Sequence, residues 1–129
     1  MKKILFSCLL MVLSISLAVA QSAANKTDAQ GKKQGFWEEK TTSGTSKGTY
    51  NDDQKDGCWT SYAGDGKLIR IENFKMGIRD GITIELDQRG YLVSESYYVD
   101  TLLEGTAKKF FDGTNPASLI DYVHGKING

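Results

Sequence analysis

Short runs of alternating hydrophobic and polar residues recur along the chain from residue 36 onward. In the clearest of them, 82–87 (ITIELD), an aliphatic residue occupies every second position. Alternation with a period of two predicts a β-strand with one apolar face. No segment carries the i, i+3, i+4, i+7 stripe of an amphipathic helix, so the pattern predicts an all-β chain. We expect strands at 36–41, 58–63, 82–87 and 106–111, and return strands at 47–51, 68–75, 92–99 and 117–124.

Glycines punctuate these segments at a regular interval. Five of them are separated by 22, 24, 24 and 24 residues, and each ends a similar pentad such as GIRDG or GKING. The residue before each glycine is Gln, Asp, Glu or Asn. Asp-Gly and Asn-Gly favour tight hairpin turns, because glycine accepts a positive φ without penalty. We therefore predict structural turns at Gly35, Gly57, Gly81, Gly105 and Gly129.

A second series of turn signals follows within each repeat, at Ser43-Gly44, Asp65-Gly66, Arg89-Gly90 and Asp112-Gly113. Two turns per repeat place one hairpin in each. A single hairpin is marginal in water, and stacked neighbours stabilise such arrays. The sequence thus predicts a single-layer antiparallel β-meander of stacked hairpin repeats over 31–129, with four repeats and the start of a fifth.

The first twenty residues have a different pattern. A basic start (MKK) precedes an apolar run without charge, which closes with the small residues AVA before Gln21. These features predict a secretory signal peptide over 1–20, cleaved near Ala20-Gln21, and hence a periplasmic or secreted protein. The following stretch, 21–30 (QSAANKTDAQ), is small and polar and predicts a flexible leader to the repeat domain.

Charge and composition narrow the classes of function. The chain has 16 basic and 16 acidic residues, and its isoelectric point of 6.6 does not suit a nucleic-acid-binding domain. A two-residue basic spot, Lys108-Lys109, is too small for a membrane track, so membrane contact is not supported beyond the signal peptide.

The sequence offers few candidate residues for catalysis or for metal binding. Signal-peptide cleavage would leave Cys58 as the single cysteine, and His124 is the single histidine. A zinc site needs about four such ligands, and no nucleophile–histidine–acid set or phosphate-binding loop is present. We therefore predict a non-enzymatic protein without metal or cofactor. Cys58 is expected either as a buried thiol or as an exposed one able to pair between chains.

Aromatic residues are the better candidates for binding. Trp37 and Trp59 occupy equivalent positions in successive repeats, so both are expected on one face, with Phe36, Cys58, Ile82 and Ile84 on the other. Two interpretations remain open. Either the tryptophans only support the sheet, or their face, together with Tyr62, recognises a protein partner.

The two ends of the predicted sheet differ in charge. The first strand carries EEK at 38–40, which discourages pairing of that edge with another chain. The last strand is more apolar, and it is followed by the turn GKING of a fifth repeat. An open edge of this kind is expected to accept a strand from a protein partner or a second copy. The residues predicted to take part are Leu119, Ile120 and Tyr122.

The motifs GKKQGFW, DGCW and SYAGDGKL followed by Phe74 resemble the variant MORN repeats of bacteria, over residues 31–129. Units of that family run roughly G-x-x-x-G-x-W, then Tyr, then N/D-G-x-L, then Tyr or Phe. The third and fourth repeats depart from it, because Thr83 and Ala107 stand where tryptophan is expected. The matching positions are Trp37, Trp59, Tyr62, Asp65–Leu68, Phe74, Tyr98 and Tyr122.

This resemblance implies the hairpin-repeat fold and a role without chemistry. MORN arrays are similar to scaffolds or lipid-associated modules, and many bacterial members are labelled YwqK-type antitoxins. We therefore expect an exported protein-binding or scaffold module, acting in the cell envelope or outside the cell. A toxin-neutralising partner is the alternative, which the predicted signal peptide weakens because an antitoxin of an intracellular toxin belongs in the cytoplasm.

Overall fold

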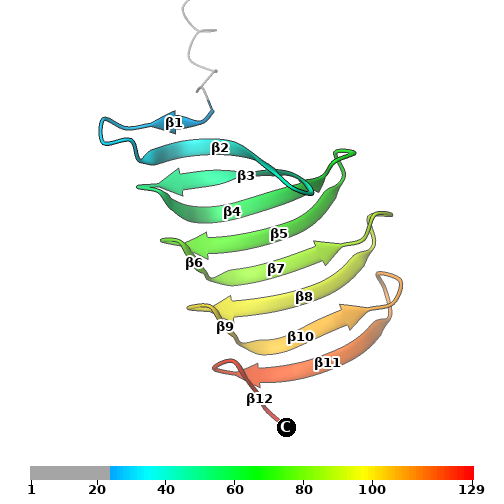
Figure 1. The fold of residues 1–129 in the computed structure, drawn as a ribbon. Helices are drawn as coiled ribbons and strands as arrows, with labels where there is room; N and C mark the ends of the chain where they lie inside the picture. Colours follow the sequence, from blue (N-terminus) through cyan, green and yellow to red (C-terminus); the bar gives the residue numbers. More distant parts are fainter. Residues whose placement is uncertain (1–23) are drawn as a thin grey trace, which may run out of the picture.

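The computed structural model describes residues 24–129, and the predicted signal peptide lies outside the described residues. The described chain forms one open antiparallel sheet of twelve strands and no helix (Figure 1). None of its elements is thus a helix that could span a membrane. The strands are β1 (Lys26–Thr27), β2 (Lys33–Thr41), β3 (Gly44–Asn51), β4 (Gln54–Ala63), β5 (Leu68–Lys75), β6 (Ile78–Arg79), β7 (Gly81–Leu86), β8 (Leu92–Val99), β9 (Leu102–Leu103), β10 (Gly105–Phe110), β11 (Pro116–Val123) and β12 (Lys126–Ile127).

The sheet is a meander. Its order is β1-β2-β3-β4-β5-β7-β8-β10-β11-β12, and the short strands β6 and β9 pair beside β5 and β8. Figure 1 shows the strands stacked in the order of the sequence, with each long strand bent along its length. Two return strands, 68–75 and 92–99, begin and end where the sequence predicts. The predicted fold class, an all-β hairpin meander, is confirmed.

The turns between repeats do not lie where the sequence predicts them. β2 and β4 begin before Gly35 and Gly57, so these glycines lie inside strands. The reversals are two-residue turns in which both residues have positive φ, the type I′ geometry that suits the twist of a hairpin. They are Asp52-Asp53 (49° and 66°), Met76-Gly77 (50° and 80°), Asp100-Thr101 (47° and 71°) and His124-Gly125 (50° and 77°).

The pentad glycines nevertheless need their conformational freedom. Gly81 has a φ of 109°, and the pairing with β5 shifts by two residues across it, from Phe74↔Arg79 to Ile71↔Ile84. This is a β-bulge, where an unpaired residue bends the strand. The residue opposite the glycine is aromatic in each repeat, so an aromatic ring faces a residue that has no side chain. The pairs are Gly35↔Tyr50, Gly57↔Phe74, Gly81↔Tyr98 and Gly105↔Tyr122.

Each type I′ turn is bonded to the preceding repeat. The backbone N–H of Thr101 donates to the carbonyl of Arg79 (2.9 Å), and equivalent bonds start at Asp53, Gly77 and Gly125. The acidic residue before the pentad glycine completes the link. The backbone N–H of Asp100 donates to the Asp80 carboxylate (3.2 Å), and that of His124 donates to the Glu104 carboxylate (2.7 Å). These polar residues therefore join repeats rather than form the turns.

The second series of turns is confirmed for its central members. In the turn from β4 to β5, the N–H of Gly66 donates to the carbonyl of Ala63 (2.9 Å), and Gly66 has a φ of 85°. Gly90 takes the same place in the next repeat, with a φ of 87° and a bond to the Asp87 carbonyl. Glycine is favoured at this left-handed position because it carries no Cβ.

The expectation of a flexible leader is wrong for the part of it that the structure describes. β1 pairs with β2 through Lys26↔Gln34 and Thr27↔Lys33. The Asn25 side chain extends this pairing, because its amide nitrogen donates to the Glu38 carbonyl (3.0 Å) while its oxygen accepts from the Glu38 N–H (2.8 Å). β1 thereby covers part of the charged strand that the sequence places at the edge.

Thr101 allows a direct test of the turn geometry. A β-branched residue at positive φ is strained, because its Cβ approaches the backbone. We expect Thr101→Gly, which creates an Asp-Gly type I′ turn, to raise the free energy of unfolding by about 0.5–1 kcal/mol, measured by urea denaturation. Thr101→Ala keeps the left-handed penalty and should gain less. A Thr101→Gly variant less stable than the parent would contradict the type I′ assignment.

Candidate functional site

Cross-strand partners lie on the same face of a sheet, so the register divides the side chains between two faces. One face, which we call the groove face, carries a polar row that runs across the long strands. Its members are Glu39, Ser46, Ser61, Arg70, Glu85, Ser94, Lys109 and Ser118. The opposite face carries the row Glu38, Lys47, Thr60, Ile71, Ile84, Glu95, Lys108 and Leu119.

The groove face of the first two repeats is filled by Trp59, which is only 1% exposed. Its ring lies against Gly48 of β3, where an added Cβ would come within 2.3 Å of it. The indole N–H donates to the carbonyl of Thr49 (3.1 Å). Tyr50 packs edge-on against the ring at 5.0 Å, and the Nζ of Lys55 lies 4.2 Å from the ring centroid. Trp59 is thus the centre of the core.

This burial bears on the interpretation of Trp59 and leaves that of Trp37 open. Trp37 lies on the same face, paired with Gly48 and edge-on to Tyr50 at 5.8 Å, as the sequence predicts. Trp37 is half-buried, and its indole N–H bonds to backbone carbonyls of Lys26 and Gln34. A side chain as enclosed as Trp59 offers no surface to a partner, so the prediction of Trp59 as a contact residue is wrong. The prediction of Trp37 as a contact residue stays a prediction.

Tyr62 does not belong with the tryptophans. It pairs with Thr45 on the opposite face, and the Nζ of Lys47 lies 5.3 Å from its ring centroid. Tyr62 stands three positions after Trp59, and an odd offset in a strand places two side chains on opposite faces, so the alternation already carried this signal. Cys58 also lies on the opposite face and is exposed, which excludes the buried-thiol alternative.

A ladder of cations and rings runs along the groove face at the type I′ turns. Lys33, Lys55 and Arg79 each stand two residues before a pentad glycine. Each lies over rings of its own repeat: Lys33 over Trp37 and Tyr50 (4.7 and 4.6 Å), Lys55 over Trp59 and Phe74 (4.2 and 5.2 Å), and Arg79 over Tyr98 (4.9 Å). These are cation–π distances. The fourth repeat has Leu103 at this position, so the ladder ends there in an apolar contact.

Lys33, the first cation of this ladder, also forms an ion pair. The Lys33 Nζ lies 2.5 Å from a Glu39 carboxylate oxygen, which also accepts the Tyr50 hydroxyl (3.0 Å). The hydrogen bond to Glu39 raises the pKa of Lys33. Partial burial acts to raise the pKa of Glu39, but the bonds from Lys33 and Tyr50 outweigh it and hold that pKa below its usual value. Sequence reasoning missed this set, because Tyr50 belongs to the next strand and only the register brings it beside Lys33 and Glu39.

The groove face is hollow in the third and fourth repeats. Thr83 and Ala107 stand two residues after their pentad glycines, where Trp37 and Trp59 stand in the first two repeats. A hollow of about 380 Å³ includes Ala107, and one of about 140 Å³ includes Thr83. The two share Glu85, Ser94 and Ser96. Thr83 and Ala107, which replace the tryptophans of the first two repeats, therefore leave this part of the groove face hollow.

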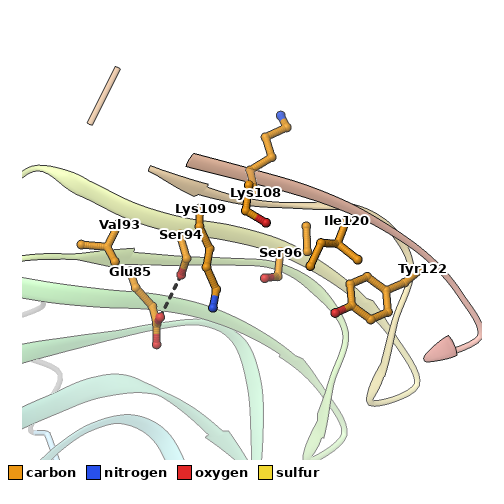
Figure 2. Close-up of a pocket in the computed structure, with 10 residues that line it drawn as sticks. Glu85, Val93, Ser94, Ser96, Lys108, Lys109, Ile120 and Tyr122 are labelled. Carbon is orange, nitrogen blue, oxygen red and sulfur yellow. Dashed lines mark hydrogen bonds between the residues drawn. The ribbon is translucent and has the colours of Figure 1, made fainter. Parts of the chain in front are cut away.

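Polar side chains gather at one end of the hollow. Figure 2 shows Lys109, Ser94 and Glu85 pointing to one side of the sheet, and Lys108 to the other. The Ser94 hydroxyl donates to the Glu85 carboxylate (2.8 Å), and Arg70 pairs with the same carboxylate (2.8 Å). The bond from Ser94 lowers the pKa of Glu85 against the opposing effect of burial, and Arg70 lowers it further.

The floor of the hollow contains a buried carboxylate, which is paired with a partly exposed arginine, and an unpaired hydroxyl. Glu72 is buried and accepts a bond from Arg79 at 2.6 Å. Thr83, between them and Ser96, is 8% exposed, and its Oγ1 has no hydrogen-bond partner among the described residues. Buried hydroxyls are normally bonded, so the Thr83 oxygen is an exception among the described residues.

The predicted C-terminal edge is only partly open. β12 pairs with β11 through Tyr122↔Ile127 and Val123↔Lys126, and the Asn128 N–H donates to the Asp121 carbonyl (2.8 Å). In the described chain, the outer backbone of β11 before Asp121 has no strand beside it. The three predicted contact residues also divide by face, because Leu119 (59% exposed) lies on the opposite face and Ile120 and Tyr122 lie in the groove.

The opposite face of the C-terminal half exposes large apolar side chains, which we call the apolar patch. Ile82 pairs directly with Tyr97, which is 50% exposed. No second layer of the described chain covers this face, since all its strands belong to one sheet. The patch consists of Ile82, Tyr97, Val99, Leu119 and Val123.

Among residues 24–129, no three His, Cys, Asp or Glu side chains gather in a way that could hold a metal ion. No protein-family model, no curated protein and no solved structure matches the chain. The resemblance to variant MORN repeats therefore stays a prediction from the sequence motifs.

Proposed function

We propose that the chain is an exported, non-enzymatic module that binds a partner protein through the apolar patch. The observation that carries the proposal is the exposure of five large apolar side chains on one uncovered sheet face. Exposed apolar surface is typical of protein interaction sites, and Ile82 and Tyr97 are direct neighbours here. The predicted signal peptide and the resemblance to MORN scaffolds support the same reading.

Tyr97 is the anchor that we expect to contribute most. It is exposed, it stands beside Ile82, and its ring presents an apolar body with a polar tip. Tyrosines at the centre of an interface are common hot spots, whereas the surrounding contacts contribute little. The salt bridge from Lys108 to Glu95 (3.0 Å) lies on the same face, so the patch has a polar neighbour that orients a partner without adding much affinity.

The chain offers a matched control for a test of this surface. Tyr91 is 49% exposed, nearly as much as Tyr97, but lies in the turn between β7 and β8, with Arg89 over its ring. We expect Tyr97→Ala to weaken binding of the captured partner by about 30-fold, the effect of losing a hot spot of about 2 kcal/mol. Tyr91→Ala should bind as the parent does.

The measurement is affinity capture from a native envelope extract with tagged protein, followed by titration of the recovered partner against both variants. Equal losses for Tyr97→Ala and Tyr91→Ala, or none for either, would place binding elsewhere. The identity of the partner also separates a scaffold from the toxin-neutralising alternative, since a small exported toxin in the capture would favour the latter.

A further inference from the structure

We propose that the hollow on the groove face of the third and fourth repeats binds a neutral carbohydrate. The site is distinct from the apolar patch, because it lies on the other side of the sheet. Its existence follows from two small residues, Thr83 and Ala107, at positions that hold indole rings in the first two repeats. At about 380 Å³, the larger part is within the range of small-molecule sites.

The charges around the hollow favour a neutral ligand. Both guanidinium groups are already paired, Arg70 with Glu85 (2.8 Å) and Arg79 with Glu72 (2.6 Å). Lys109 adds a cation to the larger part, beside the Glu85 carboxylate that also lines it. An anion entering here would therefore meet a carboxylate, and a cation would meet a guanidinium or ammonium group. Sugar hydroxyls both donate and accept, so they can bond to carboxylate and guanidinium edges without breaking either pair.

The unpaired Thr83 hydroxyl supplies the second observation. Its Oγ1 is buried in the floor of the hollow and has no partner in the described chain. The hydroxyl of Ser96, its cross-strand neighbour, lines the same space. A ligand hydroxyl between these two side chains would satisfy the Thr83 oxygen, which a purely apolar ligand would leave unpaired.

The walls provide the apolar contacts that a sugar ring needs. Ile120 and Tyr122 line the larger part, and Tyr98 lines the smaller part. Figure 2 shows Ile120 and Tyr122 close together at one end of the hollow, with Ser94 and Glu85 toward the other. Aromatic and aliphatic walls with a few convergent polar groups are the usual composition of small-ligand sites.

The test is a titration of ¹⁵N-labelled protein with four neutral tetrasaccharides: cellotetraose, maltotetraose, mannotetraose and chitotetraose. We expect at least one to cause saturable shifts in the amide signals of Thr83, Ser96 and Ile120. Thr83→Val keeps the shape but removes the hydroxyl, and should weaken binding at least tenfold. Thr60→Val, a threonine on the opposite face, should leave binding unchanged.

A second variant refills the hollow. Ala107→Trp restores the ring of the first two repeats and should abolish the shifts while the sheet stays folded by circular dichroism. Tyr97→Ala should bind the sugar normally, so the result is independent of the partner proposal. The proposal is overturned if none of the four sugars binds, if inorganic phosphate causes the shifts instead, or if a crystal structure soaked with them shows an ordered water only on Thr83.

Discussion

Replacement of Trp59 by alanine is expected to lower the free energy of unfolding by about 3–5 kcal/mol, the usual cost of emptying a fully buried aromatic site. Trp59 is 1% exposed, and it joins three strands through Gly48 of β3, Tyr50 of β3 and Glu72 of β5. A domain of this size has a total stability of about 5–15 kcal/mol. The variant should therefore lose a large part of its stability, measured by urea denaturation.

Trp37 gives the comparison for this experiment. It is the same residue type at the same position of the preceding repeat, but it is half-buried. We expect Trp37→Ala to cost clearly less than Trp59→Ala, because less apolar surface returns to water. Equal losses for the two variants would contradict the assignment of Trp59 as the centre of the core.

Gly48→Ala is the second substitution with a large expected effect. Gly48 has an ordinary backbone conformation, so an added methyl group does not strain the backbone. It affects only the side chain that it contacts. That methyl would lie 2.3–2.5 Å from three atoms of the Trp59 ring. We expect a loss of about 1–3 kcal/mol or more, because overpacking displaces a ring that neighbours hold on all sides.

The chain provides a control and a coupling test for Gly48. Gly64→Ala, in the turn after β4, meets no atom within 4 Å and should be nearly neutral. In the Trp59→Ala background the clash is absent, so Gly48→Ala should cost much less than in the parent. Such non-additivity is the signature of direct contact. Additive losses in the double variant would show that Gly48 acts on the fold without the ring.

The two faces of the sheet have different roles because the repeats are not identical. In the first two, tryptophans fill the groove face and give the array its core. In the third and fourth, Thr83 and Ala107 leave the same face hollow, while Tyr97 and Leu119 stand exposed behind it. The N-terminal half is thus built for stability, and both proposed binding surfaces lie in the C-terminal half.

The strand pattern was predictable from the sequence because alternation with a period of two is a local property. The strands β5 and β8 begin and end where expected. The positions of the type I′ turns were not predictable, since Met76 and Thr101 carry a positive φ that such residues rarely adopt. The pentad glycines gave the stronger local signal, although they serve the bulges rather than the turns.

The candidate site was predictable only in part. The alternation of side chains placed Trp37 and Trp59 together, and the same rule separates Tyr62 from Trp59 and Leu119 from Ile120. The burial of Trp59 depends on a glycine in the neighbouring strand, which lies outside its own repeat pattern. Whether a ring is enclosed or exposed is decided by its neighbours across strands, and the sequence does not state them.

The sequence by itself determined the repeat period, the all-β class and the face on which each side chain of a strand stands, because these follow from backbone periodicity and glycine spacing. The tertiary structure decided which of those faces is closed. It did so through the register, which sets Gly48 beneath Trp59 and leaves Thr83 and Ala107 without a ring to fill the space above them. The contact between Gly48 and Trp59 joins two neighbouring hairpins, so it arises only when the hairpins stack and no single repeat contains it.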